Sequence, residues 1–146
     1  AGFSIEEGHV EELRRRLNEQ ADLKPEDFIP KVWIDAAMPL EYISSGLVEE
    51  LKLLEPFGQG NEKPQFAQKG LQIRSTRVLG KNRNAVKLSL VTEKGLAMDG
   101  MLFTEGDRFL EELGEKKMRD VVYYPDVNEY NGRRTLQIVI REYKLH

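Results

Sequence analysis

The spacing of apolar residues changes near Phe66, and this change most constrains what the chain can fold into. Before Phe66 the apolar residues recur mostly at helical spacing, and after it they alternate with polar residues, as in half-buried strands. Five strand candidates and one short amphipathic helix follow the change. In chain order they are the strands 71–79, 85–91 and 96–103, the helix 106–113, and the strands 120–127 and 135–143.

Five strands with a helix between the third and the fourth is the order of elements in the OB-fold, a small Greek-key barrel. The sequence therefore predicts a mainly β chain with such a barrel at 64–146. Its loops 80–84 and 128–132 are rich in Gly and Asn, which tolerate positive φ. In this fold these two loops flank the ligand groove. The side chains predicted inside the barrel are those of Val86, Leu88, Leu90, Leu136, Ile138 and Ile140.

An α-rich segment of two helices and a short strand is predicted before the barrel, at 1–63. Ser4 and Glu7 have the spacing of a capping box, which predicts the start of the first helix. The predicted elements are a helix from Ser4 to about Gln20, a strand at 31–37 and a helix at 47–54.

The composition excludes several classes of protein. The 146 residues include no Cys, so disulfides, thiolate metal sites and cysteine nucleophiles are absent. This fits a reducing compartment, and we expect a cytoplasmic protein. No apolar run approaches the roughly 18 residues of a membrane span. We also expect a monomer.

The net charge of −3 conceals an asymmetry between the two parts of the chain. Residues 1–64 hold 7 Lys and Arg against 14 Asp and Glu, a net charge of −7. Residues 65–146 hold 15 against 11, a net charge of +4. A basic second part behind an acidic first part is typical of a chain that binds a polyanion through one part only.

The sequence offers no catalytic constellation. The two histidines, His9 and His146, lie at opposite ends of the chain and do not form a metal pair. Adjacent glutamates occur on predicted helices, where neighbouring side chains point about 100° apart and do not share a substrate. A Gly-Gln-Gly-Asn stretch at 58–61 follows no strand and opens no helix, which favours a structural turn over a phosphate loop. We therefore predict no catalytic residue and no metal ligand in this chain.

Cations and aromatic residues gather in and beside the two predicted loops. A protein that binds single strands uses cations to follow the phosphates and planar side chains on which bases stack. We therefore predict a nucleic-acid-binding groove, with Tyr130 as the foremost stacking candidate. The candidate binding residues are Arg74, Arg77, Lys81, Arg83, Lys87, Phe103, Tyr124, Tyr130, Arg133 and Arg134.

Two alternatives use the same barrel. It could serve as a docking surface for another protein or for an upstream domain, since the fold does not determine the ligand. It could also bind RNA, which a preference for the 2′-hydroxyl would reveal. Phosphate contacts weaken with salt, so the salt dependence of binding separates nucleic acid from an apolar docking surface.

Residues 54–64, Leu-Glu-Pro-Phe-Gly-Gln-Gly-Asn-Glu-Lys-Pro, resemble the bacterial RecJ family, single-strand-specific 5′-to-3′ DNA exonucleases of the DHH phosphoesterase superfamily. Residues 1–5, 34–36 and 128–134 are similar to that family as well, so the resemblance covers nearly the whole chain. It implies that 1–63 ends the DHHA1 region with its connector, and that 64–146 is the OB domain that binds single-stranded DNA.

In that family the metal-binding Asp and His residues lie in an upstream DHH domain, so none corresponds to a position here. The resemblance implies that Mn²⁺ or Mg²⁺ acts in the larger protein, where the metal activates a water for attack on the phosphate. It further implies a role in DNA repair and recombination, with single-stranded DNA and the upstream DHH domain as partners. The chain alone is expected to be inactive.

Overall fold

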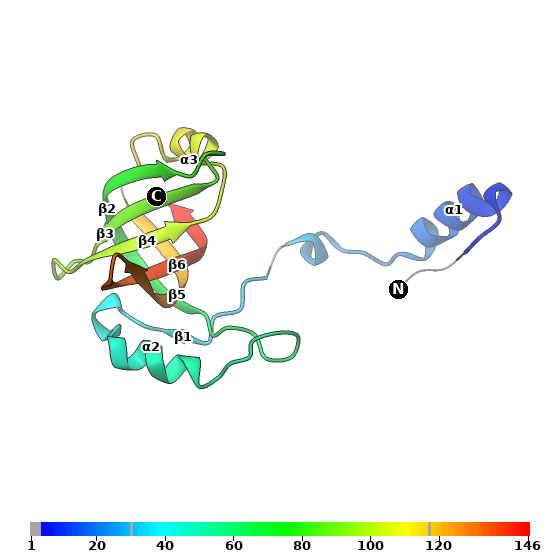
Figure 1. Cartoon of the computed structure of the whole chain (residues 1–146). Coiled ribbons are helices and arrows are strands. Elements are labelled where there is room, and N and C mark those ends of the chain that lie inside the picture. Colours follow the sequence, from blue (N-terminus) through cyan, green and yellow to red (C-terminus); the bar gives the residue numbers. More distant parts are fainter. Residues whose placement is uncertain (1–3, 30, 117) are drawn as a thin grey trace. The chain divides into compact units, whose positions relative to one another are not determined.

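Five strands of the second part of the chain hydrogen-bond around a ring (Figure 1). In the computed structural model, which describes residues 4–29, 31–116 and 118–146, their order is β2-β3-β4-β6-β5, and β5 pairs again with β2. All neighbouring pairs are antiparallel except β4 and β6. With α3 between β4 and β5, this confirms the predicted OB-fold order. The elements are β2 (Phe66–Leu79), β3 (Ala85–Val91), β4 (Ala97–Leu102), α3 (Gly106–Leu113), β5 (Met118–Tyr130) and β6 (Arg133–Leu145).

The apolar side chains of alternating strand positions fill the interior of the ring. Val86, Leu88, Leu90 and Ile138 are fully buried, Ile140 is 3% exposed, and Leu136 packs partly buried against this core. Gly100 on β4 lets the walls approach, because a Cβ there would lie 3.0 Å from Ile140 Cδ1 and 3.1 Å from Leu90 Cδ1. The predicted interior positions are thus confirmed.

The segment before the ring packs onto it. The strand β1 (Ala36–Ala37) pairs in parallel with β2, which shortens the strand predicted at 31–37 because only these two residues reach the edge of β2. The short turn η3 (Leu40–Tyr42) places Leu40 in the core. The Tyr123 hydroxyl donates a hydrogen bond to the Met38 carbonyl at 2.6 Å. These contacts lie within the second compact unit of the chain, Trp33–His146.

The helix α2 (Ser45–Lys52) starts earlier than the predicted 47–54. Ser44 is its N-cap, and the Ser44 hydroxyl oxygen accepts a hydrogen bond from the backbone N–H of Leu47 at 3.1 Å. Val48 and Leu51 are its buried residues. A side-chain cap, which satisfies a free N–H, determines where the helix begins.

The first compact unit, Ala1–Val32, holds α1 (Val10–Gln20) and the short turns η1 (Glu7–His9) and η2 (Pro25–Phe28). The capping box predicted at Ser4 is wrong, because η1 precedes α1 and His9, the N-cap of α1, makes no side-chain cap bond. Residues 1–3, part of the opening stretch that resembles RecJ, lie outside the described residues.

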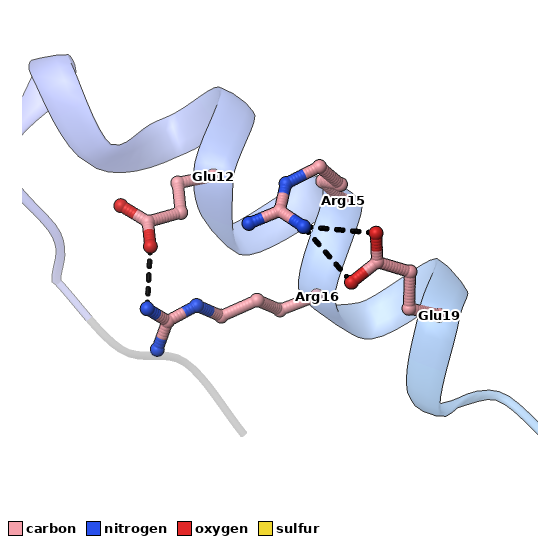
Figure 2. A network of polar contacts seen from close by, with 4 residues as sticks. All are labelled: Glu12, Arg15, Arg16 and Glu19. Carbon is pink, nitrogen blue, oxygen red and sulfur yellow. Dashed lines mark hydrogen bonds and ion pairs between the residues drawn. The ribbon is translucent and has the colours of Figure 1, made fainter.

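Ion pairs line α1 (Figure 2). Arg15 Nη1 lies 2.8 Å from Glu19 Oε1 and 3.0 Å from Oε2, and Arg16 pairs with Glu12 one turn earlier. Such exposed pairs contribute only a few tenths of a kcal/mol each. No residue of α1 is buried, so within this unit the helix lacks a packed apolar face. No helix in the described part of the chain is long and apolar enough to cross a membrane.

One charged side chain lies within the core. Arg119 on β5 is fully buried, and its three guanidinium nitrogens have no hydrogen-bond partner among the described residues. The guanidinium carbon lies 4.7 Å from the centroid of the Phe109 ring and 5.0 Å from that of Tyr143. Burial lowers the pKa of Arg119 to about 10. The two rings stabilise the cation, but its desolvation opposes folding.

Replacing Arg119 by methionine is expected to leave the free energy of unfolding unchanged or to raise it by up to about 4 kcal/mol, because an apolar chain of similar length removes the desolvation cost. The folded pKa lies below the unfolded one, so the unfolded chain holds this proton more tightly. The charged group therefore lowers stability below about pH 10, and the effect fades as pH rises through the folded pKa. Urea denaturation of both proteins at pH 7 and at about pH 10.5 measures this. A loss above about 1 kcal/mol in Arg119→Met at pH 7 would mean that ring contacts outweigh burial.

Candidate nucleic-acid interface

Strand register places the two predicted loops at opposite ends of one outer surface. The loop 80–84 adjoins the end of β4, because Val86 pairs with Leu102. The turn between β5 and β6 lies toward the start of β4, because β6 runs parallel to β4 and Gln137 pairs with Asp99. The outward residues of β3 and β4 therefore lie between the two loops.

Of the cations predicted at this end of the surface, Arg74, Arg77 and Lys81 have no ion-pair partner among the described residues. Arg77 pairs in register with Lys87, and Arg74 is added to the exposed side at a bulge in the same pairing. Lys87 Nζ lies 2.7 Å from Asp99 Oδ2, so this predicted cation is largely neutralised. The free charge of this end thus comes from the other three residues.

Arg83 holds the first loop against α3. Its backbone carbonyl accepts a hydrogen bond from the N–H of Gly106 at 2.8 Å, and its Nε donates to Asp107 Oδ2 at 2.8 Å. This contact lowers the pKa of the Asp107 carboxyl. Gly106 is required here, because a Cβ would lie 2.5 Å from Val78 Cγ1. Arg83 therefore has a structural contact that the sequence prediction did not include.

The turn between β5 and β6 displays an aromatic side chain and a cation. Asn131 and Gly132 have φ of 49° and 72°, as in the two-residue hairpin turn that suits Asn-Gly. Tyr130 and Arg133, which pair across this turn, lie on either side of it. Tyr130 is 72% exposed, and Arg133 makes no ion pair with a residue that the structure describes.

Arg134 contacts α2 instead of standing free. Arg134 Nη2 lies 2.7 Å from Glu49 Oε1, and Lys52 Nζ lies 3.1 Å from the same oxygen. These two cations lower the pKa of the Glu49 carboxyl, with the Arg134 hydrogen bond as the larger cause. Arg134 thus links the second loop to α2, and its charge is shared.

The two further stacking candidates differ in exposure. Phe103 follows β4 and is 69% exposed. Tyr124 is only 6% exposed, because the Phe57 ring packs edge-on against it with centroids 6.2 Å apart and Lys63 Nζ lies 4.7 Å from its centroid. Tyr124 therefore presents no open face to a base. Alternation requires that one of the neighbours Tyr123 and Tyr124 faces the core, but it does not show what covers the other.

The turn Gly58–Asn61 has the structural role predicted for it. Gly58 and Asn61 exchange backbone hydrogen bonds of 2.9 and 3.1 Å. Asn61 Nδ2 also donates to the carbonyl oxygens of Leu54, at 2.8 Å, and Pro56, at 3.0 Å. The turn thereby anchors the segment that carries Phe57, a residue that sequence reasoning missed although the adjacent Gly-Gln-Gly-Asn stretch marked its position.

The described residues fit no metal-dependent hydrolytic centre. No group of three or more His, Asp or Glu side chains that could hold a metal ion occurs among them. His146 Nε2 contacts a single carboxylate, Asp120, at 2.9 Å. A two-metal site needs several converging carboxylates or imidazoles.

Known proteins resemble this chain over nearly its full length. The RecJ OB domain family matches residues 34–142. The single-stranded-DNA-specific exonuclease RecJ of Bacillus subtilis is 31% identical over 144 residues, which is 97% of this chain and 18% of that protein. The protein of the same name from Haemophilus influenzae is 29% identical over 96% of this chain and 24% of its own length.

A solved structure shares the fold. The crystal structure of RecJ in complex with Mg²⁺ from Thermus thermophilus superposes with a TM-score of 0.71 at 24% identity, covering 98% of this chain and 21% of that one. The chain spans about a fifth of the length of these relatives. A closed ring in OB-fold order and a family match over 34–142 agree, and the chain belongs to the RecJ OB domain family.

Proposed function

We propose that this chain is the single-stranded-DNA-binding module of a RecJ-type 5′-to-3′ exonuclease that acts in DNA repair and recombination. The observation that carries the proposal is the pair of exposed aromatic rings, Tyr130 and Phe103, on a surface whose two ends bear free cations. Bases of a single strand can stack on such rings, whereas paired bases cannot. The cations of the proposed groove are Arg74, Arg77, Lys81 and Arg133.

We propose that the chain binds single-stranded DNA without recognising its base sequence. Each cation beside a phosphate releases condensed counterions, so affinity depends on salt and not on base identity. Each stacked base adds about 1 to 3 kcal/mol. The module would hold single-stranded DNA for a catalytic DHH domain elsewhere in the larger protein.

Fluorescence anisotropy with labelled oligonucleotides tests the proposal. We expect single-stranded DNA to bind more tightly than duplex of equal length, with a log-log salt slope of about −2 if three cations contact phosphates. Equal binding of both forms would contradict the groove. Binding indifferent to salt would favour the docking-surface alternative, and a preference for an RNA strand of the same sequence would favour RNA.

The chain alone is expected to release no nucleotides from single-stranded DNA with Mn²⁺ or Mg²⁺, since the described residues hold no metal-binding cluster. We propose that such a metal acts in the DHH domain of the larger protein. RecJ from Thermus thermophilus has been solved in complex with Mg²⁺ and in complex with Mn²⁺. Release of labelled mononucleotides by purified chain, persisting through a further purification step, would contradict this prediction.

We propose that the other partner is the rest of the same protein. Large apolar side chains of the early segment are exposed, and the chain is about a fifth as long as its relatives, so other parts could cover them. The exposed side chains are Leu17, Leu23, Phe28, Ile29, Val32 and Trp33.

Three further expectations from the sequence stay predictions. They are the monomeric state, the domain boundary between residues 63 and 64, and the cytoplasmic location.

A further inference from the structure

A pocket of about 610 Å³ lies between the segment after α2 and the strand β6. Its volume is in the range of about 300 to 1,000 Å³ that is usual for small-ligand sites. Phe57, Lys63 and Gln65 line it from the segment after α2, and Arg141 and Glu142 line it from β6. None of these residues belongs to the two loops of the proposed groove.

Phe57 gives the pocket a fixed aromatic wall. Its ring is half-buried and packs edge-on against Tyr124, with an interplanar angle of 80°. The Asn61 side chain anchors the turn that follows Phe57. A ring already held in place loses little freedom when a base stacks on it, which favours binding.

Arg141 and Lys63 supply positive charge on the other sides. The pairing of β5 and β6 shifts between Val122 and Tyr123, which pair with Glu142 and Ile140, so Arg141 is left without a partner in the ladder and lies at a bulge. Arg141 is exposed and makes no ion pair with a described residue. Lys63 Nζ lies 5.4 Å from the centroid of the Phe57 ring.

Two carboxylates at the pocket, those of Glu62 and Glu142, balance these two cations. A balanced site does not attract a run of phosphates as a basic groove does. It can take one phosphate at the cations while a carboxylate accepts a hydrogen bond from a base amino group, as Glu does from cytosine N4. The charges therefore fit a single nucleotide.

The strand register brings one residue of the pocket next to one residue of the proposed groove. Leu102 on β4 pairs with Ile140 on the parallel strand β6, so the residues that follow them, Phe103 after the end of β4 and Arg141 within β6, are neighbours. Phe103 is exposed. A strand that crosses the outer surface can thus pass from Phe103 to the pocket.

We propose that this pocket is a subsite for one nucleotide of the bound single strand, with its base against Phe57 and its phosphate at Arg141 and Lys63. The inference rests on the proposed binding of single-stranded DNA. It adds a position outside the two loops at which the strand is held.

Photo-cross-linking of the full chain to oligonucleotides that carry one 5-iododeoxyuridine, mapped by mass spectrometry, tests the subsite. Cross-links at Phe57 are expected. Cross-links confined to Phe103 and Tyr130 would overturn the subsite and leave the proposed function intact. If no single-stranded DNA binds, both fail.

Charge variants provide a second measurement. Arg141→Gln is expected to weaken binding about fivefold at 0.1 M salt and to make the log-log slope less steep by about 0.7, the effect of one lost phosphate contact. Lys144→Gln is the matched control, since Lys144 is exposed on the same strand and does not line the pocket. Both variants should keep the melting temperature of the parent, because neither side chain is buried. Equal losses in the two variants would overturn the subsite in favour of general charge attraction.

Discussion

Leu88→Ala is expected to lower the free energy of unfolding by about 2 to 5 kcal/mol, the range for a leucine shortened in a packed core. Leu88 is fully buried in the middle of β3, where it pairs with Thr76 on β2 and Gly100 on β4. The surrounding strands are tied by hydrogen bonds on both sides, so they cannot move fully into the space left by the side chain. Urea denaturation followed by circular dichroism measures the loss.

The neighbouring residue provides the control. Ser89 lies on the outer face of the same strand and is partly exposed, so Ser89→Ala is expected to change the free energy of unfolding by less than about 0.5 kcal/mol. A similarly small loss in Leu88→Ala would show that the inward and outward positions of β3 are assigned the wrong way round. Such a result would also remove the basis for placing Lys87 on the outer surface.

Tyr130→Ala is expected to weaken the binding of single-stranded DNA by about 1 to 3 kcal/mol, because it removes a stacking surface. The salt slope should stay the same, since the ring carries no charge. The side chain is 72% exposed at a hairpin turn, so its loss should not unfold the ring of strands. Fluorescence anisotropy over a series of salt concentrations separates the two quantities.

Two further variants show which property of the turn matters. Tyr130→Phe keeps the ring and should keep the affinity, whereas Arg133→Ala, at its register partner, should make the slope less steep by about 0.7. Equal losses in Tyr130→Phe and Tyr130→Ala would assign the effect to the hydroxyl instead of stacking. If neither Tyr130→Ala nor Arg133→Ala alters binding, the groove is misplaced and a docking surface becomes the better explanation.

The order of elements could be predicted because it is encoded locally. Apolar alternation at 85–91 specifies which side chains face inward, and the same side chains are buried in the structure. The start of β2 at Phe66, earlier than the predicted 71, was missed because its pairing with β5 shifts between Gln68 and Leu71. A bulge interrupts the period of two, so the pattern disappears where the strand continues.

The ends of the helices depended on local contacts that a pattern alone does not distinguish. Ser4 and Ser44 both precede apolar helical stretches, yet only Ser44 caps a helix in the structure. The helix that Ser44 caps buries Val48 and Leu51, whereas α1 buries no residue. The helix with a side-chain cap is thus also the helix whose apolar side chains are buried.

The sequence by itself determined the type of fold and the kinds of residue at the two loops, because alternation, turn chemistry and charge are properties of short stretches. Only the tertiary structure decided which of these residues remain available. Arg83 meets Asp107 24 positions away, Arg134 meets Glu49 85 positions away, and Phe57 covers Tyr124. These contacts arise when the ring closes and its connections fold back onto it, and no local pattern records which distant side chains then meet.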